Sequence, residues 1–350
     1  MATVSNLPID THAHIVPPSL VEEARKSGSK LGVTVEDTEQ GPALQFDGFT
    51  RLRPVGGLAR LEPRLEWMDQ QGLNLQILAS WLDIQGYTLP SDEAAQWARL
   101  FNDHLVEIVK PRMDKFRGLA TVPIQDGMKA ALELEYAVTQ LGFLGAMLAT
   151  DPVEQDLAKE SFEPFWAAAE QLDVPVVLHP PSHGFGANIK PGYLTFSLGR
   201  TLDTTITSAK LILGGLLDRH PKLKLVLVHG GGFLPYQAAR IDSGYLSGQG
   251  RPVELEREKP SDYLPLMYYD TVAVSENVIR LMTDIASCEH VLLGSDYVFA
   301  GPKRQLMENV EKAGLSQREV SLICCENARK LFLKESLSDG SARYVGEYTH

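Results

Sequence analysis

Short apolar segments alternate with longer amphipathic segments along the chain, and this alternation is typical of a parallel α/β fold. Eight apolar segments are found, at residues 7–15, 74–80, 116–124, 142–150, 174–180, 223–231, 266–274 and 290–298. Several, such as VPVVLHP at 174–180, are apolar at successive positions, as expected for strands buried on both faces. Segments between them, such as SFEPFWAAAEQLD at 161–173, carry apolar residues at helical spacing. Eight strand–helix units predict a closed (β/α)8 barrel, the TIM-barrel fold.

The domain organisation follows from this pattern and from the length of the chain. A closed α/β barrel of 350 residues is compatible with a single domain that carries insertions. Residues 16–60 interrupt the alternation and are interpreted as an irregular insertion with a small hairpin. The polar segment from about Ser338 to the end is expected to be a C-terminal tail.

Polar residues with metal-binding or catalytic chemistry come at the ends of the predicted strands. His12 and His14 end the first segment, His179 the fifth, His229 the sixth, and Asp296 the eighth. Because the loops after the strands build one face of such a barrel, these side chains are expected to meet there. Each histidine taken alone could be a hydrogen-bonded core residue, but the joint pattern favours a site.

The ligands of one divalent ion are predicted to be His12, His14, His179 and Asp296. Alternate residues of a strand point to the same face, so both imidazoles of the His12-x-His14 pair can reach one ion. Imidazoles with a carboxylate suit Zn²⁺ best, with Mn²⁺, Co²⁺ and Fe²⁺ also possible. The fourth segment, GFLGAMLAT, has no lysine that could bridge two ions, which favours a single ion.

The remaining histidine at a strand end, His229, is a candidate for proton transfer. A neutral imidazole beside a metal ion can move protons near neutral pH. A fourth histidine ligand is the alternative interpretation. The three glycines after His229, in VHGGG, allow close approach of a ligand, although a tight turn explains them nearly as well. Asp296 is assigned to catalysis as well as to metal binding.

Three further residues are candidates for substrate binding. Arg53 in RLRPV and Arg240 in QAARID could hold a carboxylate, because a guanidinium offers paired donors. For either arginine alone, a solvated or salt-bridged role is the alternative. His183, in the loop PPSHGFG, either lines the pocket or is solvated.

Composition limits the classes of partner and compartment. The net charge of -12 and the isoelectric point near 5.3 argue against nucleic-acid binding. Three cysteines, Cys288, Cys324 and Cys325, suggest reduced thiols rather than a disulfide framework. No apolar stretch is long enough for a membrane span, and the N-terminus does not resemble a signal peptide. A cytoplasmic enzyme with no membrane partner is therefore expected.

These motifs resemble the metal-dependent amidohydrolase superfamily, and within it the aminocarboxymuconate-semialdehyde decarboxylase-like branch, formerly labelled amidohydrolase family 2. The resemblance runs from IDTHAHIVP through RLEWMDQQGLNLQIL, VPVVLHP, GGLLDRHPKLKLVLVHGGGFLPYQAARID and VLLGSDYVF to ENARKLF. It implies a (β/α)8 barrel with one ion, held by the residues that match His12, His14, His179 and Asp296. It also implies that His229 is the catalytic histidine.

The same resemblance assigns roles to the arginines and indicates where the substrate pocket differs. Arg53 matches an arginine that holds the substrate carboxylate, and Arg240 matches one donated across a dimer interface, which implies a homodimer. The family's tryptophan-rich pocket segment is replaced here by GYLTFSLGR at 192–200, in which Phe196 is the nearest aromatic residue. His179 is followed by Pro180 rather than by a tryptophan. The metal chemistry is therefore expected to be shared more closely than the substrate.

The first functional hypothesis is non-oxidative decarboxylation of an unsaturated or aromatic carboxylic acid, which needs no organic cofactor. A cation in a dry pocket can stabilise the carbanion-like charge of that reaction by several kcal/mol. The second hypothesis is hydrolysis or hydration of a small carboxylated substrate at the same site. A third, a barrel that keeps the metal only as a structural element, is disfavoured by the spare His229.

Overall fold

Eight parallel strands form the centre of the molecule. The computed structural model describes residues 7–49, 52–151, 156–182, 184–248, 253–299 and 305–335. Each central strand lies inside one of the eight predicted segments: β1 (Ile9–Ile15), β5 (Leu75–Ser80), β6 (Phe116–Gly118), β7 (Ala146–Ala149), β8 (Pro175–His179), β9 (Lys224–Leu227), β10 (Tyr268–Asp270) and β11 (Val291–Leu292). The eight strands are thus confirmed in order and in place.

Backbone pairing closes these strands into a barrel. One sheet has the order β1-β5-β6, and a second has the order β7-β8-β9-β10-β11, with every neighbouring pair parallel. A bridge between Ala120 and Ala146 joins β6 to β7. At the other seam, Ala13 of β1 pairs with Tyr297, beyond β11. The predicted (β/α)8 barrel is therefore confirmed.

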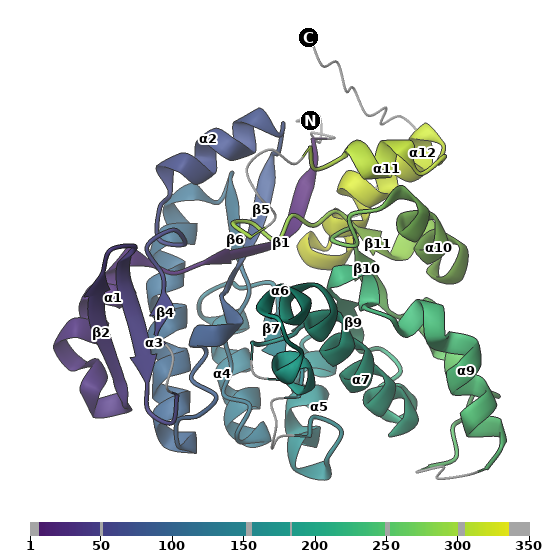
Figure 1. Ribbon diagram of the computed structural model, residues 1–350, viewed down its shortest axis with the longest axis horizontal. Helices are drawn as coiled ribbons and strands as arrows, with labels where there is room; N and C mark the ends of the chain where they lie inside the picture. Colours follow the sequence, from purple (N-terminus) through teal and green to yellow (C-terminus); the bar gives the residue numbers. More distant parts are fainter. Residues whose placement is uncertain are drawn as a thin grey trace.

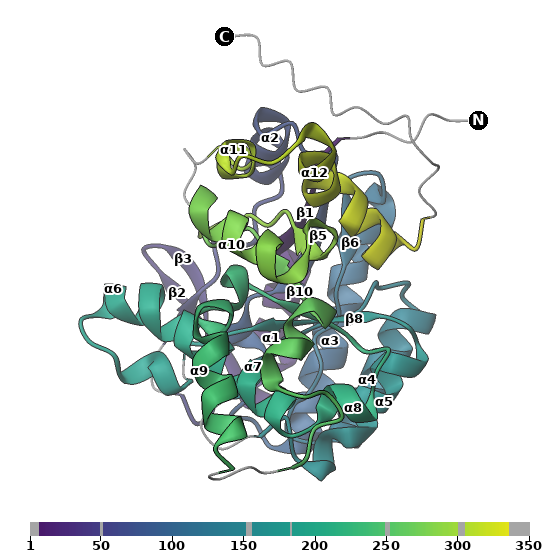
Figure 2. The same ribbon diagram turned by 90° about the vertical axis from the view of Figure 1, so that its right-hand side faces the viewer.

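Helices surround the strands and follow them along the chain (Figure 1). Their bounds are α1 (Pro18–Ser27), α2 (Glu62–Gln70), α3 (Ser91–Val109), α4 (Gly127–Thr139), α5 (Glu163–Gln171), α6 (Gly192–Leu194), α7 (Arg200–Leu213), α8 (Leu216–Arg219), α9 (Leu234–Leu246), α10 (Glu276–Ala286), α11 (Glu308–Lys312) and α12 (Gln317–Ser321). The segment around α6 projects from the body of the molecule in Figure 2. It belongs to the long connection between β8 and α7.

The core lies between the barrel and its helices. All five residues of β8 are buried, as the continuously apolar segment 174–180 predicted. In α3, one stripe of residues at helical spacing, including Ala94, Trp97 and Phe101, is buried while the opposite face is exposed. Complete burial of a large apolar side chain such as Phe101 contributes roughly 1.5–3 kcal/mol. This packing gives the ends of the strands a rigid support.

Residues of the expected insertion form a small antiparallel sheet beside the barrel. The hairpin β2 (Val33–Thr38) and β3 (Gly41–Phe46) is extended by the short strand β4 (Arg53–Pro54). Together with α1, it lies on the left in Figure 1. The description of residues 1–350 as one domain with an insertion at 16–60 stays a prediction, and the tail from about Ser338 lies outside the described residues.

Across the described part of the chain, no helix combines the length and the apolar character needed to cross a bilayer. All three cysteines lie in this part, and each is a free thiol.

Candidate metal centre

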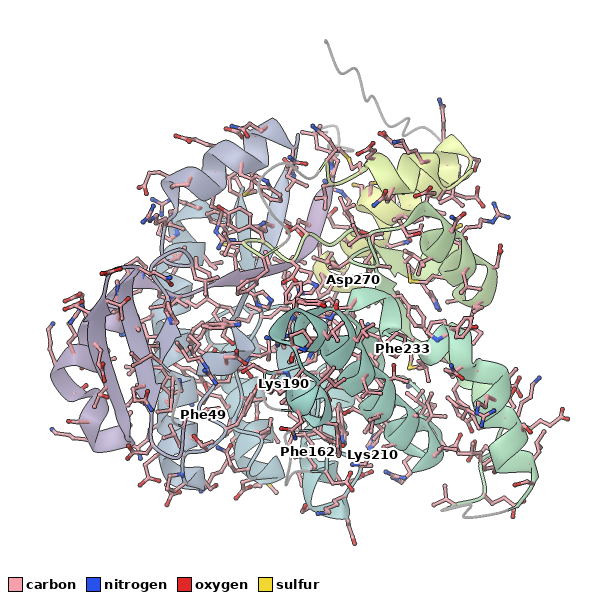
Figure 3. The ribbon with its side chains drawn as sticks, in the orientation of Figure 1. Phe49, Phe162, Lys190, Lys210, Phe233 and Asp270 are labelled. Atoms are coloured by element: carbon pink, nitrogen blue, oxygen red, sulfur yellow. The ribbon has the colours of Figure 1, made fainter. Side chains whose placement is uncertain are left out.

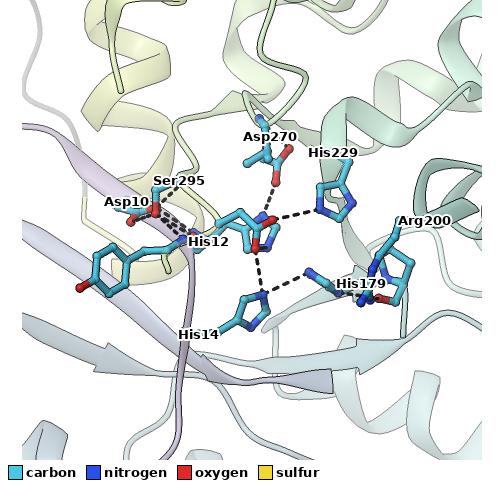
Figure 4. A network of polar contacts seen from close by, with 12 residues as sticks. Asp10, His12, His14, His179, Arg200, His229, Asp270 and Ser295 are labelled. Atoms are coloured by element: carbon cyan, nitrogen blue, oxygen red, sulfur yellow. Dashed lines mark hydrogen bonds and ion pairs between the residues drawn. The ribbon is translucent and has the colours of Figure 1, made fainter. Parts of the chain in front are cut away.

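Five polar side chains meet at the C-terminal ends of the barrel strands. His12 and His14 alternate along β1, and His179 is the last residue of β8. His229 follows β9 and Asp296 follows β11. The ring centroids of His14 and His179 lie 4.7 Å apart, and those of His179 and His229 lie 5.1 Å apart. The structure therefore brings together residues from both ends and the middle of the chain (Figure 4).

Four of these side chains form a compact set of possible ligands. One atom from each of His12, His14, His179 and Asp296 lies within 4.8 Å of the corresponding atoms of the other three. Oδ1 of Asp296 lies 3.3 Å from Nε2 of His14 and 3.5 Å from Nε2 of His12. Nε2 of His14 and Nε2 of His179 are 3.2 Å apart. All four residues are buried.

Hydrogen bonds on the far side of each ring fix which nitrogen carries the proton. Nδ1 of His14 lies 2.9 Å from the carbonyl oxygen of Ser80, and Nδ1 of His179 lies 3.0 Å from that of Pro180. A carbonyl oxygen can only accept, so both Nδ1 atoms must donate. Nδ1 of His12 lies 2.6 Å from Oδ2 of Asp270 and donates in the same way. In the neutral rings, each Nε2 is left with a lone pair.

The donor set fits a divalent cation. Three Nε2 lone pairs and one carboxylate oxygen converge, and such acceptors facing one another would repel without a positive charge among them. Among the described residues, Nε2 of His12 and Oδ1 of Asp296 are buried and have no hydrogen-bond partner. Buried polar atoms without partners are costly, and three imidazoles with a carboxylate are ordinary ligands of zinc and related ions. The structure thus supports one divalent metal site.

The protonation states of His14, His179 and Asp296 agree with this assignment, whereas the surrounding carboxylates of Asp270 and Asp296 outweigh burial and raise the pKa of His12. Burial and the neighbouring histidines hold the pKa of His179 well below its ordinary value, which keeps the ring neutral. Burial also lowers the pKa of His14, although Asp296 opposes this. Burial alone would raise the pKa of Asp296, but His14 and His229 hold it well below its ordinary value. Neutral imidazoles and an ionised carboxylate are the forms that bind a metal ion.

His229 stands beside this set of four. Its Nε2 lies 3.6 Å from Oδ2 of Asp296, the carboxylate oxygen that does not face His12 and His14. Both residues have a left-handed backbone, with φ of 55° for His229 and 58° for Asp296. Such conformations are unfavourable for residues other than glycine and are common at functional sites. The backbone therefore holds these two side chains face to face at a local cost.

Asp270 is a part of the site that sequence reasoning missed. It ends β10, and its Oδ2 accepts the Nδ1 proton of His12 at 2.6 Å. Its Oδ1 accepts from the backbone N–H of Gly230 and of Val272, at 3.0 and 3.1 Å. The signal was present in the sequence, because Asp270 interrupts the apolar segment 266–274 near a strand end. Asp270 therefore orients the candidate metal ligand His12 and also fixes the backbone next to His229.

A second buried network supports β1 from behind. Asp10 accepts from the hydroxyl of Ser295 at 2.6 Å and from the side-chain amide of Gln76 at 2.7 Å. Gln76 in turn accepts from Arg64 at 2.6 Å, and Arg64 also donates to the carbonyl oxygen of His14. Burial lowers the pKa of Arg64 to about 10, so the guanidinium remains charged at neutral pH. These contacts tie the His12-x-His14 segment to the strands on either side.

A cavity of about 700 Å³ opens beside the four-residue cluster. His179, His229 and Asp296 form part of its wall, and most of the remainder is apolar or aromatic, including Trp81, Phe196, Phe233, Val272, Met282 and Phe299. Phe196 lines this cavity, and its role in substrate binding stays a prediction. Figure 3 labels Phe233, which directly precedes α9 and lines the cavity, and Asp270, the last residue of β10. The cavity can enclose an aromatic ring.

Arg53 and Arg240 both lie outside the cavity wall of their own chain, and their roles in substrate binding stay predictions. Arg53 is buried in β4, with Nε 3.9 Å from Oδ2 of Asp83 and the guanidinium 4.7 Å from the ring centre of Phe49. Arg240 is exposed on α9. Among the described residues, the cavity wall contains a different arginine, Arg200, which no sequence motif indicated. His183 lies outside the described residues, and its role stays a prediction.

The chain matches a protein-family model and several characterised proteins. The model described as "Amidohydrolase" matches residues 9–333. The gamma-resorcylate decarboxylase of Rhodococcus jostii (strain RHA1) is 31% identical over 288 residues, which cover 77% of this chain and 86% of that protein. The 2-amino-3-carboxymuconate-6-semialdehyde decarboxylase of Dictyostelium discoideum is 24% identical over 319 residues, which cover 90% of this chain and 89% of that protein.

Two further similarities concern the fold and a different reaction. The crystal structure of a dihydroxybenzoic acid decarboxylase from Polaromonas sp. JS666 has a TM-score of 0.74, with 24% identity, and covers 95% of this chain and 98% of that one. That structure contains manganese and the inhibitor 2-nitroresorcinol. A 2-keto-4-carboxy-3-hexenedioate hydratase from Sphingobium sp. (strain NBRC 103272 / SYK-6) is 28% identical over 313 residues, which cover 83% of each chain.

Proposed function

The chain belongs to the amidohydrolase family, in its aminocarboxymuconate-semialdehyde decarboxylase-like branch, and we propose on that premise that it is a metal-dependent carboxy-lyase. Its substrate is an aromatic or unsaturated carboxylic acid, which loses CO2 without oxidation. The observation that carries this proposal is the convergence of four metal-ligand atoms within 4.8 Å, beside an aromatic-lined cavity that His229 enters.

The ligand set would hold the cation through His12, His14, His179 and Asp296. When bound, a divalent cation supplies Lewis-acid stabilisation of the negative charge that develops as CO2 leaves. Zinc, which the sequence favoured, and manganese, which the Polaromonas structure contains, both suit three imidazoles and a carboxylate. Elemental analysis of the purified protein distinguishes these two metals.

His229 would move the proton that the reaction requires. When the bond between the substrate carbon and its carboxylate breaks, the electron pair stays on that carbon and CO2 departs. A proton must then reach the same carbon. His229 lines the cavity and is only 12% exposed, so it can hold a proton at the substrate without free exchange with water. Asp296 orients it from the metal side at 3.6 Å.

The cavity wall would exclude water and hold a planar substrate. Trp81, Phe196, Phe233 and Phe299 line it and favour a flat, unsaturated body. A pocket with few waters strengthens electrostatic stabilisation of the developing charge. This environment favours loss of CO2 over attack by water.

The experiment that tests this function measures CO2 released from a panel of aromatic and unsaturated acids, gamma-resorcylate included, by metal-loaded protein. Release of CO2 that stops on chelation is expected. Incorporation of labelled water without CO2 would instead support the second candidate, a hydratase or hydrolase. The 28% identity to a hydratase supports testing this second candidate. The panel of acids therefore includes an unsaturated dicarboxylic acid as the substrate for hydration.

A homodimer is the proposed active form. Arg240 is exposed on α9, as is Tyr236 at 78%, so both side chains are available to a second copy. Arg240 would then reach the substrate pocket of the partner rather than its own. Analytical ultracentrifugation tests this state: a dimer supports the proposal and a monomer contradicts it. The free thiols agree with a reducing compartment such as the cytoplasm.

A further inference from the structure

A positively charged side chain, that of Arg200, lines the cavity beside the candidate metal ligands. No sequence motif indicated it. Arg200 is the first residue of α7 and directly follows η6 (Thr195–Gly199), a π-helical turn. Among the described residues that line the cavity, it is the one arginine or lysine. Its side chain is 16% exposed, so most of the guanidinium is removed from water. A cation in a largely apolar wall requires partners, and its partners are incomplete.

Two contacts hold the guanidinium of Arg200. Nη1 donates to the carbonyl oxygen of Pro180 at 2.5 Å, and Nη2 lies 3.8 Å from Oδ2 of Asp83. The second distance is an ion pair but is too long for a hydrogen bond. Asp83 is also shared, because Arg53 lies 3.9 Å from the same oxygen and the backbone N–H of Ser182 donates to its Oδ1 at 2.7 Å. One carboxylate thus serves two arginines.

The other acid near Arg200 is directed elsewhere. Asp203 lies one turn further along α7, and its Oδ1 accepts from the backbone N–H of Gly186 at 2.8 Å. It does not belong to the described cavity wall. A guanidinium has five N–H donors, and the described contacts engage only some of them. Arg200 therefore retains donors that can bind an anion from inside the cavity.

The position of Arg200 also relates it to the metal ligands. The carbonyl oxygen of Pro180 accepts both from Arg200 and from Nδ1 of His179. Arg200 and the candidate metal ligand His179 thus share one hydrogen-bond acceptor, and Figure 4 shows the two side chains next to each other. An aromatic ring in the cavity can present one carboxylate to the metal ligands and a second anionic group to this arginine.

We propose that Arg200 binds a second carboxylate of the substrate and thereby selects dicarboxylic acids over monocarboxylic acids. This inference rests on the proposed decarboxylase function of the same site. The reacting carboxylate meets the metal ligands, whereas the second one receives paired N–H donors from Arg200. The role is one of specificity, because the second carboxylate remains on the product.

Ligand binding to the manganese-loaded enzyme tests the role of Arg200. Isothermal titration with benzoate and with phthalate, isophthalate and terephthalate scans the spacing between two carboxylates on one ring. Wild-type protein is expected to bind at least one of the three dicarboxylates about tenfold more tightly than benzoate. Arg200→Met should abolish that preference while changing benzoate affinity less than twofold, and Arg200→Lys should retain part of it.

A matched control and a second measurement separate specificity from structure. Arg112 is exposed in η3 (Lys110–Arg112), before the start of β6 and so at the opposite end of the barrel, and Arg112→Met should retain the full preference. Metal content of Arg200→Met should equal that of wild type. Equal weakening of benzoate and dicarboxylates, or no dicarboxylate preference in wild type, would overturn the inference. CO2 release from monocarboxylic acids is assayed separately, so the decarboxylase proposal can stand when this inference fails.

Discussion

Asp296 and His229 face each other across 3.6 Å, from Oδ2 to Nε2, while Oδ1 of the same carboxylate faces the histidines of β1. One carboxylate therefore connects the ligand set to the residue proposed for proton transfer. The sequence left two roles open for His229, proton transfer and metal ligation, and this arrangement favours the first. Four other side chains already form the candidate ligand set, so we propose that His229, on the second oxygen of Asp296, transfers protons.

Replacement of His229 tests that separation. His229→Gln is expected to retain metal at the wild-type level, because the four ligand atoms are unchanged. Turnover should fall by about 10²–10⁴-fold, the usual contribution of a positioned proton donor. Metal content by mass spectrometry and CO2 release are measured on the same sample. Loss of the metal together with activity would make His229 a ligand.

Asp270 is expected to set the metal affinity through His12. Asp270→Asn keeps the shape of the side chain but removes the charge that accepts the Nδ1 proton of His12 at 2.6 Å. Loss of such a partner typically lowers metal affinity by about 10–100-fold. Competition with a chromogenic chelator measures this. Asp126→Asn, at the N-cap of α4, serves as the control and should leave affinity unchanged, whereas an unchanged affinity in Asp270→Asn would refute the role.

Asp203 predicts a pH dependence of stability. Burial raises the pKa of Asp203 from 3.8 to about 6, so the folded protein favours the protonated form. The contribution of Asp203 to the free energy of unfolding is therefore complete below pH 4 and is lost as the pH rises through about 6. Asp203→Asn cannot ionise, so the variant should not lose stability through this group as the pH rises. Between pH 4.5 and 7 the melting temperature of wild type should fall relative to the variant by on the order of 2 °C. Parallel profiles would show that this pKa is not raised.

Two glycines hold the segment that precedes Arg200. A Cβ on Gly199 would lie 2.5 Å from the carbonyl oxygen of Gly186, and one on Gly186 would lie 2.2 Å from that of Gly199. Gly199→Ala should therefore displace η6 and α7, lower the melting temperature and weaken ligand binding in the cavity. Gly192→Ala is the control, because nothing lies within 4 Å of its Cβ position. Equal melting temperatures for the two variants would contradict this close packing.

The sequence predicted the barrel and the ligand set because both depend on local periodicity. Continuous apolar runs mark strands buried on two faces, and each run becomes one of the eight strands. Parallel strands of a barrel end on the same face, so polar residues at strand ends must converge. Asp270 carried the same signal and could have been found by applying that rule to the seventh strand.

Other features depend on the direction of side chains in irregular segments, which periodicity does not report. Arg200 follows a connection of twenty residues after His179, from 180 to 199, and its entry into the cavity depends on the path of that connection. Arg53 belongs to the small sheet beside the barrel, and its pairing with Asp83 depends on how that sheet packs. The protonated nitrogens of the histidines also follow from tertiary contacts alone.

Metal stoichiometry tests whether His12, His14, His179 and Asp296 together bind one divalent cation. Elemental analysis of wild-type protein and of His14→Ala, after both are incubated with manganese and dialysed, measures ions bound per chain. We expect about one ion in wild type and close to none in the variant, because one of four ligands is lost. Equal metal content in the two proteins, or none in wild type, would rule out this four-residue site.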